Sequence, residues 1–214
     1  RNGKDRIQVY EGSINEESQD KETGYEQVAP TVYALVAAID AKDSFTFQHS
    51  TNVSQYAVLL AQKLGLSRND IQTVKVAGLL HDIGKIGIPE SILKKAGKLT
   101  NEEYEIMKSH VEKSIEMIHY LPNMNYVIPA VVSHHERYDG KGYPRGIKGE
   151  EIPFLGRILA VCDSFDAMIS KRAYKEPLSV EYAMGELEKN KGTQFDPEVA
   201  DAFIELIKEG KVPL

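Results

Sequence analysis

The chain has 214 residues, of which 42% are hydrophobic and 27% charged, a composition that suits one globular domain with short appendages. Its formal net charge of −6 argues against a surface built to hold DNA or RNA, although it does not exclude a small nucleotide. The sequence shows no signal-peptide pattern and no apolar run near the roughly 18 residues of a membrane span. Cys162 is the single cysteine, which excludes an internal disulfide and favours a cytoplasmic setting.

The N-terminal region differs from the rest of the chain. The chain begins at Arg1 rather than at a methionine, and we expect it to be part of a longer protein. The first ten residues, RNGKDRIQVY, join an Asn-Gly turn to alternating apolar residues, which predicts a turn into a short strand. The following stretch through residue 27 is acidic and poor in core-forming residues, so we interpret it as a linker or an exposed helix.

Helical periodicity begins at Val28. Two apolar stripes cover residues 28–42 and 53–64. Ser67 is the expected cap of a third helix, with Asp70 in the capping-box position. This helix brings His81-Asp82 to its C-terminal end, where glycines interrupt it.

The second half of the chain continues the helical pattern. A fourth helix is predicted from Thr100 through Ile115, carrying His110, and a fifth between Pro122 and His134, with prolines bracketing it. The Gly- and Pro-rich stretch 136–153 predicts a long loop. Further helices are expected at 155–170, after Ser179 and after the cap pair Asp196-Pro197. The predicted fold class is therefore all-α, a helical bundle with one long loop.

Five of the six histidines fall at predicted helix ends or beside loops, and two aspartates join them. The seven candidate metal ligands are His49, His81, Asp82, His110, His134, His135 and Asp163. One such histidine is more often a helix cap or a satisfied core group. The adjacent pairs 81–82 and 134–135 are costly to bury unless they are paired or coordinate a metal. His119, the sixth histidine, has no such neighbours, and we interpret it as a surface or core residue.

The number and type of these groups indicate two metal ions. Seven ligands are too many for one ion, and the absence of a second cysteine excludes a tetrahedral thiolate zinc site. Nitrogen and oxygen ligands suit divalent transition metals, with iron or manganese foremost and nickel, cobalt or zinc as alternatives. A carboxylate bridging two ions ~3.5–4 Å apart suits displacement at phosphorus, so the residues predict a two-metal phosphate-ester hydrolase.

Two long motifs resemble one family. The stretches HDIGKIGIP at 81–89 and HHERYDGKGYP at 134–144 are similar to the signatures of the HD-GYP family, a branch of the HD-domain metal phosphohydrolases. AIDAKDSFTFQHS at 38–50, DSFDAM at 163–168 and KRAYK at 171–175 support the resemblance. It covers nearly everything from about residue 28 to 210 and implies an all-α fold. The implied activity is hydrolysis of cyclic di-GMP to pGpG and then to GMP.

The resemblance also implies roles for individual residues. One ion would be held by His49, His81, Asp82 and Asp163, and the second by Asp82, His110, His134 and His135. Asp82 would therefore bridge the ions. Lys85 would act in catalysis by reaching a phosphate oxygen or the leaving group, and Arg172 and Lys175 would hold the distal phosphate.

Three further positions have more than one interpretation or depart from the family pattern. Asp166 resembles a carboxylate placed behind a ligand or on the substrate side, with an ordinary helix charge as the alternative. Tyr143 in the GYP loop would shape the substrate pocket or contact a partner domain, and the alternative is a self-packed structural loop. Phe45 stands four residues before His49, where some family members carry a glutamate for a third metal. We therefore predict two ions rather than three.

The first residues resemble the closing segment of a GGDEF domain, the fold that makes cyclic di-GMP. The predicted organisation is a GGDEF tail at 1–11, a linker at 12–27 and an HD-GYP domain at 28–214. A GGDEF domain in cis or trans and a second copy of the chain are the partners to consider. Two other functions stay open: a low-turnover module that binds cyclic di-GMP or a protein, and a hydrolase of another cyclic dinucleotide or of pGpG.

Overall fold

The computed structural model describes residues 28–39, 42, 46–171 and 176–214. The predicted strand and linker, Phe45, Arg172 and Lys175 lie outside the described residues. Within the described ranges, β pairing is limited to an isolated bridge between Lys191 and Phe195, so the predicted all-α fold class is confirmed. None of the described helices has the length and apolar character required to cross a membrane.

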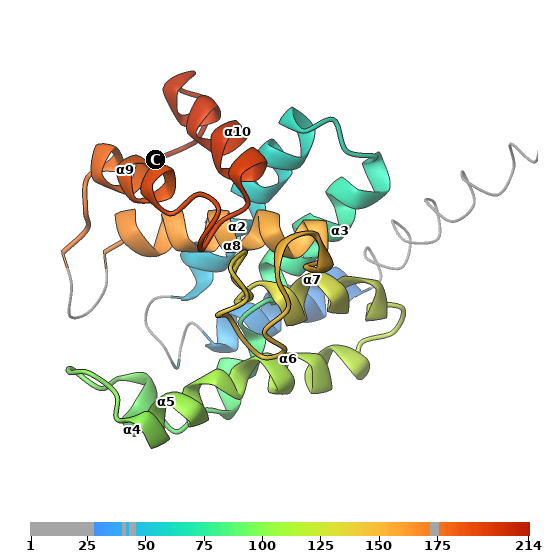
Figure 1. The fold of residues 1–214 in the computed structure, drawn as a ribbon. Helices are drawn as coiled ribbons and strands as arrows, with labels where there is room; N and C mark the ends of the chain where they lie inside the picture. The colour runs from blue at the N-terminus through green and yellow to red at the C-terminus, as the bar shows by residue number, and fades with distance from the viewer. Residues whose placement is uncertain (1–27, 40–41, 43–45, 172–175) are drawn as a thin grey trace, which may run out of the picture.

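The helices follow one another along the chain, and the predicted Gly- and Pro-rich loop separates Ser133 from Gly149. After a helix over residues 28–39, the described elements are α2 (Thr46–Lys63), α3 (Arg68–Leu80), η1 (Ile83–Gly87), α4 (Glu90–Leu93), α5 (Asn101–Lys108), α6 (His110–His119), η2 (Asn125–Val127), α7 (Ile128–Ser133), η3 (Gly149–Glu151), α8 (Phe154–Ile169), α9 (Val180–Lys189) and α10 (Pro197–Lys208). Figure 1 shows α8 across the middle of the molecule, with α9 and α10 on one side and α4 to α6 on the other.

The core is built around α2, α3 and α8. The rings of Tyr56, Phe165 and Phe203 join α2, α8 and α10 in tilted and edge-to-face contacts with centroids 5.1–6.0 Å apart, geometry that aromatic pairs prefer. A Cβ at Gly78 would lie 2.8 Å from the Cα of Ser54, so this glycine lets α2 and α3 approach backbone to backbone. These helices carry four of the seven candidate ligands on themselves or directly at their ends.

The predicted fourth helix is divided in two at Ser109. The capping box of Thr100 and Glu103 is present as predicted, but α5 ends at Lys108 and α6 begins at His110. The Ser109 hydroxyl donates to the carbonyl of Ile106 at 2.6 Å, and such a local bond competes with the regular helical ladder. The prediction of one continuous helix was therefore wrong, and the break places His110 in the first turn of α6.

The predicted fifth helix is also shorter than expected. Residues 125–127 form the 3₁₀ turn η2, and α7 covers only Ile128–Ser133. Pro129 marks the N-terminal end of α7. It lies in the first turn, where the missing N–H would have no helical acceptor in any case.

Candidate metal centre and substrate pocket

All seven predicted metal ligands converge in the structure. Asp82, His110, His134 and His135 form one group, and His49, His81 and Asp163 form another. Within each group, the potential ligand atoms all lie within 4.8 Å of one another. The groups draw on α2, the end of α3, the start of α6, the end of α7 and the middle of α8. Helices far apart in the sequence therefore meet at one site.

Asp82 lies between the two groups. Its Oδ1 is 3.2 Å from His110 Nε2 in the first group, whereas its Oδ2 is 3.3 Å from His81 Nε2 in the second. One carboxylate thus presents one oxygen to each set of imidazoles. This is the orientation that a bridging ligand requires.

The backbone fixes the orientation of three of the imidazoles. The Nδ1 atoms of His81 and His110 lie 2.8 Å from the carbonyl oxygens of Gly78 and Met107, and His134 Nδ1 is 2.5 Å from that of Val131. Each acceptor stands three residues before its histidine. A carbonyl accepts only from a protonated nitrogen, so Nδ1 carries the proton and Nε2 is left as the metal-binding atom.

Several of these ligand atoms are buried without a partner. The Nε2 atoms of His81, His110 and His134 and the Oδ1 of Asp82 are buried, and none makes a hydrogen bond within the described part of the chain. Leaving a polar atom buried and unsatisfied costs about 1–3 kcal/mol, so four of them at one point need an explanation. Imidazole nitrogens and a carboxylate oxygen converging on a common space fit divalent metal ions.

The pKa values of the ligands suit metal binding. Burial opposes ionisation of Asp82, but Lys85 and His81 outweigh it and hold its pKa well below the usual range. Burial, with His135 and His81 nearby, lowers the pKa of His134 well below its ordinary value. Burial likewise lowers the pKa of His135 to about 4. At neutral pH, Asp82 is therefore an ionised carboxylate and His134 and His135 are neutral imidazoles, the forms that bind metals.

His49 differs from the other histidines because acidic groups surround it. Burial opposes its protonation, but hydrogen bonds with Asp163 and Asp166 outweigh this and raise its pKa to about 9. His49 Nε2 is 3.2 Å from Asp163 Oδ1, and both atoms belong to the second ligand group. A metal ion in this group would take the place of the proton on Nε2.

Asp166 lies behind His49. It is fully buried, and its Oδ2 is 2.7 Å from His49 Nδ1 and accepts from Ser170 Oγ at 3.0 Å. Its Oδ1 accepts from the side-chain amide of Asn52 at 2.8 Å. Both carboxylate oxygens are thus engaged with the protein, on the side of the imidazole opposite the metal-binding nitrogen. Of the two predicted roles, this geometry favours a carboxylate that orients a ligand over one that touches substrate.

The turn after Asp82 packs directly against α6. Ser114 Oγ accepts from the Gly84 N–H at 2.8 Å and donates to the His81 carbonyl at 3.0 Å. A Cβ at Gly84 would lie 2.0 Å from the carbonyl oxygen of His110 and 2.4 Å from the Ser114 nitrogen. The glycine of the HDIGK stretch therefore permits the backbone contact that holds His81-Asp82 against His110.

Gly84→Ala is expected to destabilise the domain and impair metal binding, because the added methyl group collides with backbone atoms that cannot rotate away. Overpacking of this kind costs about 1–3 kcal/mol. Thermal unfolding and metal analysis measure the two effects. Gly185→Ala on α9 is the matched control, since a Cβ there meets nothing within 4 Å and alanine favours a helix. A Gly84→Ala protein with wild-type stability and metal content would contradict the packing argument.

Lys85 lies on η1 and contacts the bridging carboxylate. Its Nζ donates to Asp82 Oδ2 at 2.6 Å, and 23% of its side chain is exposed. Lys42 holds the same turn from the other side, because its Nζ donates to the carbonyl of Ile86 and to that of Ile88, the latter at 2.7 Å. Sequence reasoning had assigned no role to Lys42, although it lies within the 38–50 stretch that resembles the family.

A pocket of about 370 Å³ opens beside the ligands. Its lining includes His134, His135 and Asp163 on one side. The ring of Tyr143 stacks on His135 with centroids 4.8 Å apart, and Tyr104 meets Tyr143 edge-on at 6.3 Å. Tyr143 thus covers a metal ligand and forms a wall of the pocket, a position that suits its predicted role in shaping a substrate site.

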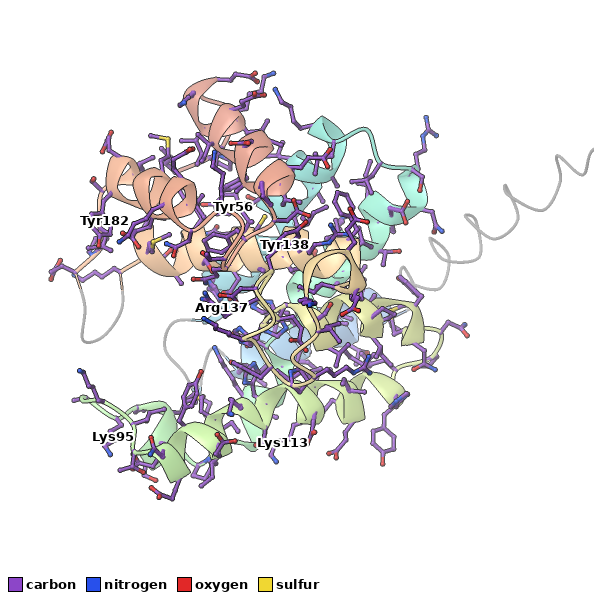
Figure 2. The ribbon with its side chains drawn as sticks, viewed as in Figure 1. Tyr56, Lys95, Lys113, Arg137, Tyr138 and Tyr182 are labelled. Carbon is purple, nitrogen blue, oxygen red and sulfur yellow. The ribbon has the colours of Figure 1, made fainter. Side chains whose placement is uncertain are left out.

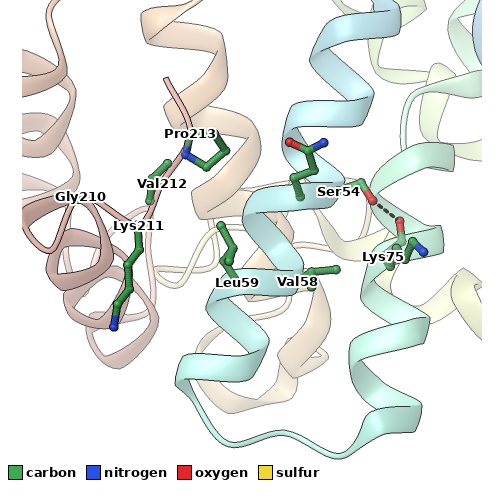
Figure 3. Close-up of a pocket in the computed structure, with 9 residues that line it drawn as sticks. Ser54, Val58, Leu59, Lys75, Gly210, Lys211, Val212 and Pro213 are labelled. Atoms are coloured by element: carbon green, nitrogen blue, oxygen red, sulfur yellow. Dashed lines mark hydrogen bonds between the residues drawn. The ribbon is translucent and has the colours of Figure 1, made fainter.

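A larger groove of about 630 Å³ lies elsewhere, between α2, α3 and the C-terminal residues (Figure 3). Ser54 bridges α2 and α3 there by donating to the carbonyl of Lys75 at 2.7 Å. None of the nine residues lining this groove is a histidine, aspartate or glutamate. The smaller pocket, which borders the ligands, is therefore the candidate active site.

Comparison with known proteins identifies the family. The family model described as "HD domain" matches residues 34–199. The chain belongs to the HD domain family. This membership confirms the predicted relationship to the HD-domain phosphohydrolases, and the two histidine-aspartate groups lie within the matched range.

Relatives of this HD domain include several named phosphodiesterases. A cyclic di-GMP phosphodiesterase of Thermotoga maritima is 44% identical over 78% of this chain and 46% of its own length. The cyclic di-GMP phosphodiesterase response regulator RpfG of Xanthomonas campestris is 41% identical over 84% of this chain and 48% of its own length. The 3′3′-cGAMP-specific phosphodiesterase 2 of Vibrio cholerae is 39% identical over 81% of this chain and 34% of its own length. The HD domain chain thus spans about half or less of the length of these relatives.

Solved structures support the fold. A cyclic GMP-AMP-specific phosphodiesterase of V. cholerae superposes with a TM-score of 0.67 at 18% identity, covering 85% of this chain and 49% of that one. The HD domain of the L. monocytogenes phosphodiesterase PgpH, in complex with cyclic-di-AMP, superposes with a TM-score of 0.57 at 20% identity. The match covers 85% of this chain and 98% of that one. At these identities the likeness concerns the arrangement of the helices.

Proposed function

We propose that this HD domain is a metal-dependent phosphodiesterase that hydrolyses cyclic di-GMP to pGpG and then to GMP. The observation that carries the proposal is the set of buried, unpartnered ligand atoms that converge beside a pocket. The names of the two most similar relatives described above support cyclic di-GMP as the substrate. The HD-GYP motifs at 81–89 and 134–144 support it independently.

The residues of the site divide the chemical work. The two ligand groups would hold two divalent ions, which supply Lewis-acid polarisation of the scissile phosphate and activation of water near neutral pH. Asp82, ionised and oriented toward both groups, would fix the spacing between them. Lys85, which is in contact with Asp82, would approach the phosphoryl oxygens or the leaving 3′ oxygen. Asp166 would fix the orientation of the His49 ring through its contact with Nδ1.

Other residues would position the substrate. Tyr143 and Tyr104 would exclude water and form the aromatic wall of the pocket. Arg172 and Lys175 would hold the distal phosphate. This part of the proposal depends on the family resemblance, because both residues lie outside the described range.

Two metal ions per chain are expected, with iron or manganese as the bound elements. The seven ligands form two groups, and Phe45 offers no ligand for a third ion. Elemental analysis of protein purified without oxygen, calibrated against protein concentration, measures the count. His119→Ala is the control, because His119 is exposed and its Nδ1 contacts only Asn125 Oδ1 at 2.9 Å. One ion or three at full occupancy in the wild type would contradict this prediction.

The function is tested by incubating protein loaded with Fe²⁺ or Mn²⁺ with cyclic di-GMP and identifying the products by chromatography. Formation of pGpG and GMP supports the proposal. Tight binding without turnover would instead favour a binding module. Preferential cleavage of 3′3′-cGAMP would favour the activity that three of the Vibrio relatives have in their names.

We further propose that the domain works in the cytoplasm beside a GGDEF domain joined to it through residues 12–27. The GGDEF-like residues 1–11 support the neighbouring domain. The single cysteine, which allows no internal disulfide, supports the cytoplasmic setting.

A further inference from the structure

One wall of the substrate pocket has a polar cluster that the metal chemistry does not use. Arg137, Gln194 and Ser164 all line the pocket, together with His134, His135 and Asp163. Arg137 Nη1 donates to Gln194 Oε1 at 3.2 Å, and Gln194 Nε2 donates to Ser164 Oγ at 3.4 Å. Ser164 follows Asp163 directly in α8, so the cluster adjoins the metal centre.

Asp139 holds the guanidinium group of Arg137 in place. Arg137 Nε donates to Asp139 Oδ1 at 3.1 Å and Nη2 donates to Oδ2 at 2.9 Å, a bidentate pair. The contact with Gln194 uses a third N–H. A guanidinium group has five N–H donors, so one remains on each terminal nitrogen. The Arg137 side chain is 32% exposed and lines the pocket, so a ligand in the pocket can reach it.

The backbone makes this arrangement rigid. The amide of Tyr138 donates to the Gln194 carbonyl at 3.2 Å, and that of Asp139 donates to the Thr193 carbonyl at 2.8 Å. These bonds join the loop after α7 to the turn before α10. Figure 2 shows Arg137 near the middle of the molecule, below α8 in this view. The two remaining donors of Arg137 are thus fixed before a ligand arrives.

We propose that Arg137 selects guanine over adenine by donating two hydrogen bonds to O6 and N7 of a substrate base. Guanine presents two acceptors on this edge, whereas adenine presents one acceptor and an amino donor that would oppose an arginine N–H. The inference rests on the proposed function, because it names the residue that reads the base of a cyclic dinucleotide.

The pairing of Arg137 with Asp139 argues against a phosphate clamp. The carboxylate neutralises most of the guanidinium charge, which reduces the attraction of a phosphate dianion or monoanion. It leaves the direction of the two remaining N–H groups unchanged. The Arg137–Asp139 pair would therefore bind a ligand through directed N–H groups more than through net charge. Two directed N–H groups match the acceptors of a base edge, whereas a phosphate depends more on charge.

The experiment compares the wild type with Arg137→Ala, Arg137→Lys and the control Arg145→Ala. Arg145 is exposed on the same loop and does not line the pocket. Affinity for cyclic di-GMP and cyclic di-AMP is measured by calorimetry, and kcat/KM is measured for both. Hydrolysis of bis(p-nitrophenyl) phosphate, a phosphodiester without a base, reports the metal centre alone.

Both Arg137 variants are expected to lose about 10- to 100-fold in affinity and kcat/KM for cyclic di-GMP, as for loss of one bidentate base contact. Their values for cyclic di-AMP and their hydrolysis of the base-free ester should stay at wild-type levels. Arg145→Ala should match the wild type throughout. The lysine variant is decisive, since lysine keeps the charge but lacks the paired donors.

Three results would overturn the inference: full cyclic di-GMP affinity in Arg137→Lys, equal losses for both dinucleotides, or no preference for guanine in the wild type. Failure of the proposed function has a different signature. In that case the metal-loaded wild type cleaves neither the dinucleotides nor the base-free ester, while the calorimetric comparison of guanine with adenine still tests the role of Arg137.

Discussion

Asp82→Ala is expected to remove both metal ions and to lower phosphodiesterase turnover by on the order of 10⁴-fold, as when an essential member of a catalytic group is removed. The reason is the position of the carboxylate between the ligand groups, 3.2 Å from His110 Nε2 and 3.3 Å from His81 Nε2. The other carboxylate among the seven ligands, Asp163, groups with His49 and His81, and its Oδ1 is 3.2 Å from His49 Nε2. Elemental analysis and the cyclic di-GMP assay measure the two losses.

A second variant separates this effect from a folding defect. Asp82→Asn keeps the volume of the side chain but removes its charge, so it should fold while binding metal weakly. Added Mn²⁺ should raise the unfolding temperature of the wild type, because a ligand bound only by the folded state stabilises it. The same addition should leave both Asp82 variants unchanged. If Asp82→Ala retained two ions and normal turnover, Asp82 could not be the bridge.

Lys85→Ala is expected to lower kcat by about 10²–10³-fold with a small change in KM, as for loss of a contact made mainly in the transition state. Lys85 is in contact with the bridging carboxylate and partly exposed, so it can approach the developing charge on a phosphate. Arg172→Ala should mainly raise KM, because a distal phosphate is held equally before and during the reaction. Steady-state kinetics with cyclic di-GMP distinguish the two patterns.

The 2.6 Å contact between Lys85 and Asp82 suggests the rival explanation to check. If Lys85 served only to hold the carboxylate, Lys85→Ala would lose metal in parallel with activity. Metal content should instead stay at the wild-type level. Lys94→Ala is the matched control, since Lys94 pairs with Glu90 on the exposed surface of α4. A Lys85 defect confined to KM would reduce this residue to a phosphate clamp.

The sequence carries much of the information about this domain because several of its signals are local. Helical periodicity, caps such as Ser67 and Asp196, and Gly/Pro-rich loops act over a few residues, so the all-α fold followed from them. The adjacent pairs 81–82 and 134–135 predicted a metal site for a similar reason, and the structure brings their side chains together. The types of residue and their positions at helix ends already restricted the chemistry.

The predictions that failed concern where helices begin and end. Apolar periodicity does not show such boundaries, because local hydrogen bonds can interrupt a helix inside an apolar stripe. The apolar spacing of residues 101–119 continues through Ser109, but a single hydroxyl bond to Ile106 ends the helix there. The predicted fifth helix is likewise shorter than its apolar stretch, because residues 125–127 form the 3₁₀ turn η2. In neither case does the apolar stripe alone show where the helix begins or ends.

By itself, the sequence determined which residues could bind metal and that helices would carry them, because residue type and helical spacing are properties of short segments. Only the tertiary structure decided how they work together. It turned the two oxygens of Asp82 toward different imidazoles, placed Asp166 behind His49 and joined Arg137 to Gln194, 57 residues away. Such contacts depend on the packing of α2, α3, α7 and α8 and on glycines such as Gly84 that let backbones meet. Packing of distant segments is set by the whole core, and no short stretch of the chain encodes it.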